Sequence, residues 1–187
     1  MGFGGSQNPS ISCESDLAIR STGDLARFEA LGCKTVKGDL VIGEDDGGSW
    51  QGNAASDLGG MASLLQVEGD LVIAGLAIAQ LTGLQNLREV GGSLIIENNQ
   101  NLTGLAALSG LQVIEGDLTI AFNLRLTTLL AGTGWESDLL AGQLTVRNNT
   151  LLPQCAVDEL SAHLDADCHQ PPELYCELLN TGASDCD

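Results

Sequence analysis

Five copies of one phrase run along the chain, and the first of them reads Val36-Lys37-Gly38-Asp39-Leu40-Val41-Ile42. The other copies span residues 67–73, 90–96, 114–120 and, more loosely, 140–146. The third residue is a glycine in every copy, and the steps between these glycines are 31, 23, 24 and 26 residues. Steps of this length are typical of one coil of a leucine-rich repeat or of a β-helix. The sequence therefore predicts a solenoid, mainly β in content.

Each copy has the pattern of a short parallel strand. In the first copy Leu40 and Ile42 alternate with Val41, and β-branched residues favour strands. We therefore expect Leu40 and Ile42 to face the core and Val41 to face outward. A second apolar series, 84–90 and 108–114, is expected to bring the chain back to the next strand.

An asparagine-rich turn follows the later copies of the phrase. Asparagine tolerates left-handed backbone and bonds neighbouring turns, which favours a structural role over ligand binding. The residues that we expect to stack from coil to coil are Asn99, Asn123 and either Asn148 or Asn149.

Helix signals lie at both ends of the repeats. Ser21 to Asp24 has capping-box spacing and Gly32 can end a helix, which predicts an N-terminal cap helix over about 21–31. Pro153 can begin a second cap helix, over about 154–165. We expect one domain over residues 13–168, a flexible segment over 1–12 and a disulfide-stapled tail over 169–187.

Composition excludes two classes of partner. The net charge is -18 and only seven residues are Lys or Arg, so the surface repels phosphate backbones and anionic lipids. The chain has no apolar run of the length of a membrane span, and residues 1–6 lack the pattern of a signal peptide. We therefore expect neither nucleic-acid binding nor membrane insertion.

The six cysteines lie only before and after the repeats, where a solenoid needs caps. Disulfides there indicate an oxidising compartment, that is, an extracellular, cell-surface or periplasmic location. Six cysteines allow 15 pairings. Closure between nearest neighbours predicts the pairs Cys13 with Cys33, Cys155 with Cys168, and Cys176 with Cys186. The alternative for the C-terminal group is a zinc site made by Cys155, His163, Cys168 and His169.

The N-terminal region resembles a known module. Cys13, the phrase Asp16-Leu17-Ala18-Ile19-Arg20, a helix ending at Cys33, and then a Gly-Asp-Leu-Val-Ile strand resemble the receptor L domain of the insulin and epidermal growth factor receptors. The resemblance covers residues 13 to about 155 and extends to secreted bacterial proteins with L-like repeats. It implies a single-stranded right-handed β-helix of about five coils and an extracellular binding module. It does not imply growth-factor binding or signalling.

Aspartates recur at one position of the phrase. Asp39, Asp70 and Asp117 are equivalent, and neighbouring rungs of a sheet lie about 4.8 Å apart. Two carboxylates that close are compatible with a calcium site or a retaining glycosidase. The plainer interpretation is that aspartate suits the turn into each strand, because Ser93 and Gln143 occupy the same column without a charge.

Irregular inserts hold the remaining candidates. Asp45, Asp46 and Asp57 lie in the stretch that lengthens the first repeat, and they are candidates for weak calcium binding or a solvated acidic loop. Trp50 and Trp135 also lie in inserts. Each tryptophan either contacts a ligand or folds back over the core, since tryptophan is favoured at interface hot spots and loops often carry binding residues.

A β-branched column lies beside the aspartates and is expected to face outward. An uncovered strip of this kind is a candidate face for a protein or carbohydrate, and less so for ice. The alternative is ordinary sheet propensity at half-exposed positions. The members of the strip are Val41, Val72, Ile95, Thr119 and Thr145.

These patterns favour a non-catalytic extracellular or cell-surface module that binds a protein or glycan and needs no cofactor. A structural surface or matrix protein that self-associates is the second hypothesis. A β-helical polysaccharide-active enzyme is the third, and it lacks the grouped acidic and basic residues that such chemistry needs, since only Arg147 stands near a column of the sheet.

Overall fold

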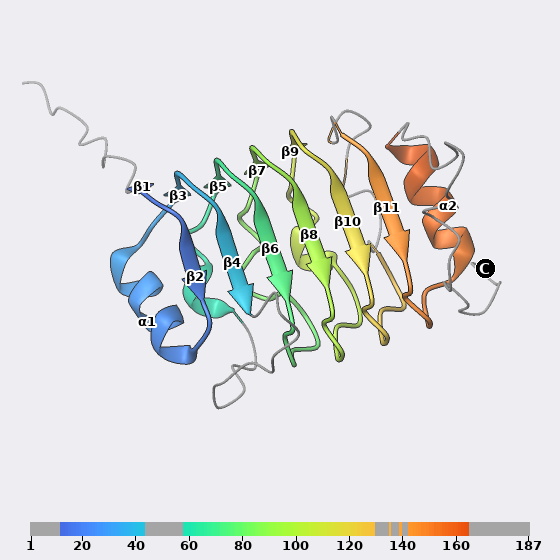
Figure 1. Cartoon of the computed structure of the whole chain (residues 1–187), viewed down its shortest axis with the longest axis horizontal. Helices are drawn as coiled ribbons and strands as arrows, with labels where there is room; N and C mark the ends of the chain where they lie inside the picture. The colour runs from blue at the N-terminus through green and yellow to red at the C-terminus, as the bar shows by residue number, and fades with distance from the viewer. Residues whose placement is uncertain (1–11, 44–57, 130–134, 136–138, 140–141, 165–187) are drawn as a thin grey trace, which may run out of the picture.

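The computed structural model describes residues 12–43, 58–129, 135, 139 and 142–164 of the 187-residue chain. These residues form a mainly β structure of two parallel sheets with a helix near each end (Figure 1). The prediction of a mainly β solenoid is confirmed at this level. The division into residues 1–12, 13–168 and 169–187 stays a prediction.

The larger sheet holds six strands in the order β11-β10-β8-β6-β4-β2. Five of them are the copies of the repeated phrase, and the sixth precedes the first copy. Their bounds are β2 Leu17–Ile19, β4 Leu40–Gly43, β6 Leu71–Ala74, β8 Leu94–Glu97, β10 Leu118–Ala121 and β11 Leu144–Arg147.

The smaller sheet holds five two-residue strands in the order β1-β3-β5-β7-β9. Each of these strands stands a few residues before a strand of the larger sheet, so one passage of the chain contributes to both sheets. Their bounds are β1 Ser12–Cys13, β3 Thr35–Val36, β5 Gln66–Val67, β7 Glu89–Val90 and β9 Val113–Ile114. Two 3₁₀ turns, η1 Gly59–Met61 and η2 Ala106–Leu108, lie on the return path.

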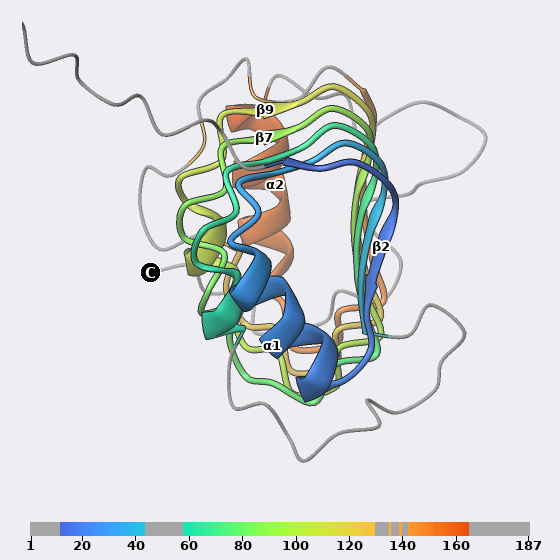
Figure 2. The ribbon, with the colours of Figure 1, turned by 90° about the vertical axis from the view of Figure 1, so that its left-hand side faces the viewer.

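Figure 2 looks along the stack, where the backbone of each coil runs around the outside. The buried side chains form one hydrophobic core inside the coils. Leu94 pairs in register with Leu71 on one side and Leu118 on the other, and all three are fully buried. The second apolar series packs opposite them, with Leu84, Leu87, Val90, Leu108, Leu111 and Ile114 all buried. Burial of each such side chain contributes about 1.5 to 3 kcal/mol, so the core is the main source of stability.

A ladder of asparagines closes the end of the larger sheet. The Oδ1 atom of Asn123 accepts the backbone N–H of Asn99 at 3.1 Å, and Oδ1 of Asn149 accepts that of Asn123 at 3.0 Å. The Nδ2 groups of Asn99 and Asn123 donate to Ile73 O and Ile96 O, each at 2.9 Å. The three asparagines are fully buried, so their amides supply the partners that buried backbone groups need.

The structural role expected for these asparagines is confirmed, with one difference. The ladder uses Asn149, while the left-handed conformation belongs to the residue before each ladder asparagine. These residues have φ of 57° at Asn98, 56° at Phe122 and 56° at Asn148. The left-handed residue turns the chain, and the next residue directs its amide into the core.

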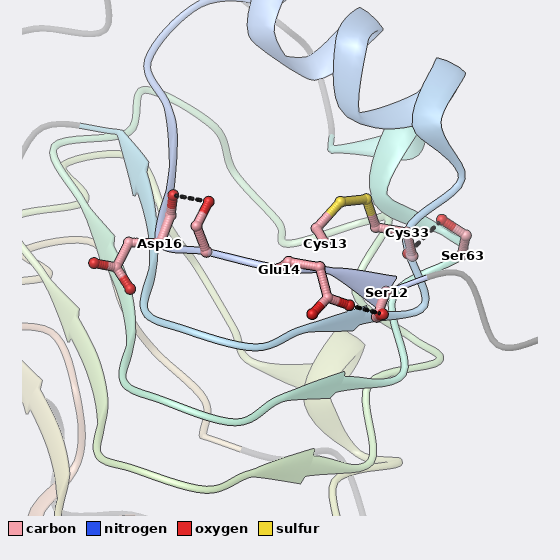
Figure 3. The surroundings of a disulfide bond; sticks show 7 residues. Ser12, Cys13, Glu14, Asp16, Cys33 and Ser63 are labelled. Atoms are coloured by element: carbon pink, nitrogen blue, oxygen red, sulfur yellow. Dashed lines mark hydrogen bonds between the residues drawn. A yellow bond between two sulfur atoms is a disulfide. The ribbon is translucent and has the colours of Figure 1, made fainter.

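Helix α1 (Thr22–Leu31) covers the N-terminal end. Ser21 Oγ accepts the backbone N–H of Asp24 at 3.1 Å, and Gly32 ends the helix with φ 63°. Phe28 is the side chain that α1 buries. A disulfide joins Cys13 to Cys33 across a Cα–Cα distance of 5.8 Å, as predicted (Figure 3).

Helix α2 (Gln154–His163) stands at the C-terminal end and directs Val157 and Leu160 into the core, and Leu164, the residue after the helix, is also buried there. Cys155 takes part in a disulfide, so its sulfur cannot serve as the zinc thiolate considered above. The pairs Cys155 with Cys168 and Cys176 with Cys186 involve residues outside the described part of the chain.

The first prediction concerns the buried ladder. Asn123→Ala removes the side chain that bonds the buried N–H of Asn99 and the buried C=O of Ile96 in the previous coil, and each such group costs about 1 to 3 kcal/mol when it loses its partner. We expect the free energy of unfolding in urea to fall by about 2 to 6 kcal/mol, the sum for the two groups. The matched control is Asn101→Ala, whose exposed amide donates once to Ala77 O and should change stability by less than about 1 kcal/mol. Equal losses in the two variants would contradict the ladder's role.

The second prediction concerns the cap of α1. The Ser21 hydroxyl donates to Asp24 and holds the pKa of this carboxyl below its ordinary value, against the raising effect of burial. A folded-state pKa below the unfolded one adds stability above the unfolded pKa, and this stability is lost as the pH falls through the folded value. We expect Ser21→Ala to raise the pKa of Asp24 in an NMR titration of its carboxyl carbon. An unchanged pKa of Asp24 in this variant would show that the Ser21 hydroxyl does not lower it.

Candidate functional site

The aspartate column forms a second ladder, at the start of each strand of the larger sheet. Each side-chain oxygen accepts the backbone N–H of the equivalent residue in the next coil. Asp39 Oδ1, for example, accepts the N–H of Asp70 at 2.8 Å, and Asp70 Oδ1 accepts that of Ser93 at 2.7 Å. The whole series runs from Asp16 through Asp39, Asp70, Ser93 and Asp117 to Gln143.

This ladder explains the residue types in the column. Ser93 replaces aspartate because its hydroxyl oxygen accepts the N–H of Asp117 in the same way, at 3.2 Å. From Asp39 onward each member follows a glycine that must lack a side chain: a Cβ on Gly38, for example, would stand 2.7 Å from the backbone N of Asp16. The sequence signal was a short oxygen-bearing residue after each glycine, but the direction of the bonds could not be predicted from it.

The carboxylates of this column are thus engaged by backbone donors of the next coil. Within the described part of the chain, no group of three or more His, Cys, Asp or Glu side chains is arranged to hold a metal ion. Asp45, Asp46 and Asp57, the candidates for weak calcium binding, lie outside the described residues. The calcium and glycosidase interpretations of the column therefore gain no support, and the structural interpretation accounts for it.

The β-branched strip forms one continuous row across the sheet. Val41 pairs with Val72, and Ile95 lies between Val72 and Thr119 in register. Thr145 follows Thr119 on β11. All five side chains are half-buried, while their neighbours along each strand are buried. Figure 1 looks onto this face, and no described helix or strand lies in front of it.

The tryptophan candidates have different outcomes. Trp135 is 1% exposed, and its Nε1–H donates to Leu108 O at 2.8 Å, behind η2. The ring is therefore a core residue, which corrects the expectation that it contacts a ligand, because a buried indole with a satisfied N–H has no surface to offer. Trp50 lies outside the described residues, so its role stays a prediction.

One group of outward residues was missed by the sequence reasoning. It lies at the end of β11 and on the turns after β10 and β11, and we call it the corner cluster: Phe122, Leu124, Arg125, Arg147 and Leu151. The guanidinium carbon of Arg147 stands 5.0 Å from the centroid of the Phe122 ring. Leu124 and Leu151 are 41% and 50% exposed, which is high for large apolar side chains. The unusual signal was Phe122 itself, where the neighbouring turns have Asn98 and Asn148.

The described helices are too short and too polar to cross a membrane. The stacked coils position the two side-chain ladders and the outward strip.

A comparison with models of known families matches residues 32–155 to the receptor L domain. The match covers about two thirds of the chain and includes all five copies of the repeated phrase. No curated protein and no solved structure matches the chain. Receptor L domains are non-catalytic ligand-binding modules that do not depend on a cofactor. On its repeats, its parallel sheets and this match, the chain belongs to the receptor L domain family.

Proposed function

We propose that this protein is a non-catalytic extracellular or cell-surface module that binds a protein or glycan ligand through the outward face of its larger sheet. The observation that carries the proposal is the alignment of Val41, Val72, Ile95, Thr119 and Thr145 in one row. We also infer that the coils form the single-stranded right-handed β-helix of receptor L domains. The family supports ligand binding in general, and the disulfide supports an oxidising compartment.

The shape of the row suits a binding face. Parallel rungs place the five side chains about 4.8 Å apart, so together they make a firm, nearly flat surface. Half-buried β-branched side chains have few rotamers, and they lose little conformational entropy when a ligand covers them. The absence of a charge in this row contrasts with the acidic surface around it, and charged residues are depleted at the centres of interfaces.

A comparison of the strip with the two ladders supports the same proposal. The strip residues make no coil-to-coil side-chain hydrogen bond, whereas the column before them and the asparagines after them do. The identity of a strip residue is therefore less constrained by stability than that of a ladder residue. A uniform row of Val, Ile and Thr at such positions favours a role for their surface.

The third prediction tests the strip. Ile95→Lys, at its centre, should lower the affinity for a ligand by about tenfold or more, because it places a charge in a desolvated contact. The ligand is sought with a glycan array and an extracellular-protein screen on oxidised protein, with calcium and with chelator. Binding constants are then compared by surface plasmon resonance.

The matched control is Val113→Lys, which makes the same kind of change on the smaller sheet, where Val113 is exposed. Both variants should keep the wild-type melting temperature within a few degrees, since both sites are solvent-accessible. A ligand that binds wild type and Ile95→Lys equally would contradict the assignment of the strip. A Trp50→Ala variant measures the contribution of the insert that follows β4. Reversible self-association without any ligand would instead favour the hypothesis of a structural surface or matrix protein.

A further inference from the structure

The corner cluster contains a backbone conformation that its residue type does not favour. The left-handed position after each strand of the larger sheet is Gly75, Asn98 and Asn148 in three of the turns, with φ of 69°, 57° and 56°. These residue types adopt it readily. Phe122 adopts it with φ 56°. A bulky residue there is an outlier, and such outliers concentrate where a side chain must be held for function.

The left-handed conformation of Phe122 places its ring against a residue of the next coil. Its half-buried ring carries the Arg147 guanidinium 5.0 Å from its centroid, from the next coil along. Thr150 Oγ1 donates to Leu124 O at 3.3 Å, which joins the two turns, and Arg125 and Leu151 are the next residues on them. The two leucines thus lie on adjacent turns beside two arginines.

The charge of the cluster is opposite to the net charge of the chain. Five of the 25 acidic and four of the seven basic residues lie before position 44, which leaves 20 acidic and three basic residues for the rest of the chain. Of these three, Arg88 is used internally, since its Nη1 donates to Gln85 O, Leu87 O and Gly110 O. The other two are Arg125 and Arg147, and neither forms an ion pair with a described residue.

We infer that the corner cluster is a second binding surface, next to the end of the strip on β11, and that its ligand is an acidic peptide segment of a partner protein with leucine-like side chains between its carboxylates. The carboxylates complement Arg125 and Arg147, and the apolar side chains cover Leu124 and Leu151. A peptide fits better than an acidic glycan because exposed leucines gain from apolar side chains and not from hydroxyl groups. One face of the Phe122 ring is already covered by Arg147, which leaves less of it for stacking on a sugar.

The probe is a fluorescein-labelled heptapeptide of alternating glutamate and leucine, measured by fluorescence anisotropy with the full oxidised chain. Comparison probes carry glutamine in place of glutamate or serine in place of leucine, and labelled oligogalacturonate represents an acidic glycan. We expect the glutamate–leucine peptide to bind best and to weaken as salt is raised, because exposed charge contacts are screened. Equal binding of the glutamine or serine peptide, or tighter binding of oligogalacturonate, would overturn the proposal.

Variants locate the site. Arg125→Glu should lower the peptide affinity by about tenfold or more, because it turns an attraction into a repulsion. Arg20→Glu makes the same charge change at an exposed residue near the other end of the stack and should leave the affinity within about twofold. Leu151→Ser should weaken binding, while Leu65→Ser, at another exposed leucine, should not. Equal affinities of Arg125→Glu and Arg20→Glu would overturn the assignment.

Phe122→Asn separates binding from stability. It restores the residue type of the neighbouring turns, so the melting temperature should not fall, while peptide affinity should drop severalfold as the ring is lost. A purely structural Phe122 would give unchanged affinity in this variant, and that result would overturn its part in the site. Ile95→Lys should keep wild-type peptide binding, so a failure of the strip and a failure of the corner cluster are distinguishable.

Discussion

The register between neighbouring coils is the constraint on which the rest of the structure depends. Two side-chain ladders hold it, one at each end of the strands of the larger sheet. At the start, Asp39 Oδ1 reaches forward to the N–H of Asp70 in the next coil. At the end, Asn123 Oδ1 reaches back to the N–H of Asn99 in the previous one. A slip of one residue would break both contacts and turn the core leucines outward, so the register is unique.

A fixed register turns positions in a repeat into rows on a surface. The row of Val41, Val72 and Ile95 exists because these residues pair strand by strand, although 31 and 23 residues separate them in the chain. The same pairing brings Phe122 under Arg147. Since the ladders and the core carry the stability, outward positions can change with little effect on the fold, and binding can be placed on them.

The sequence predicts what is local and repeated, and it fails where distant groups meet. The glycine spacing and the alternation in Leu40-Val41-Ile42 predicted the parallel rungs, and the spacing of Ser21 and Asp24 predicted α1, because both patterns depend on near neighbours. The buried indole of Trp135 bonds Leu108 O, 27 residues earlier in the chain. A contact between such distant residues could not be predicted, so the sequence alone allowed either a ligand contact or a core position for this ring. The corner cluster was missed for the same reason, since its members come from two turns.

The aspartate ladder also shows how a strongly acidic chain tolerates carboxylates on adjacent rungs. Two charges about 5 Å apart repel by about 1 kcal/mol in water, so Asp39 and Asp70 oppose the stacking of their coils. A hydrogen bond from a backbone N–H to a carboxylate contributes about 1.5 to 3 kcal/mol, and each aspartate of the ladder makes one. The bond outweighs the repulsion, and Ser93 interrupts the series of charges between Asp70 and Asp117 without interrupting the bonds. The column therefore joins the coils through its oxygens, and its charge is not required, because the uncharged hydroxyl of Ser93 makes the same bond at 3.2 Å in the middle of the stack.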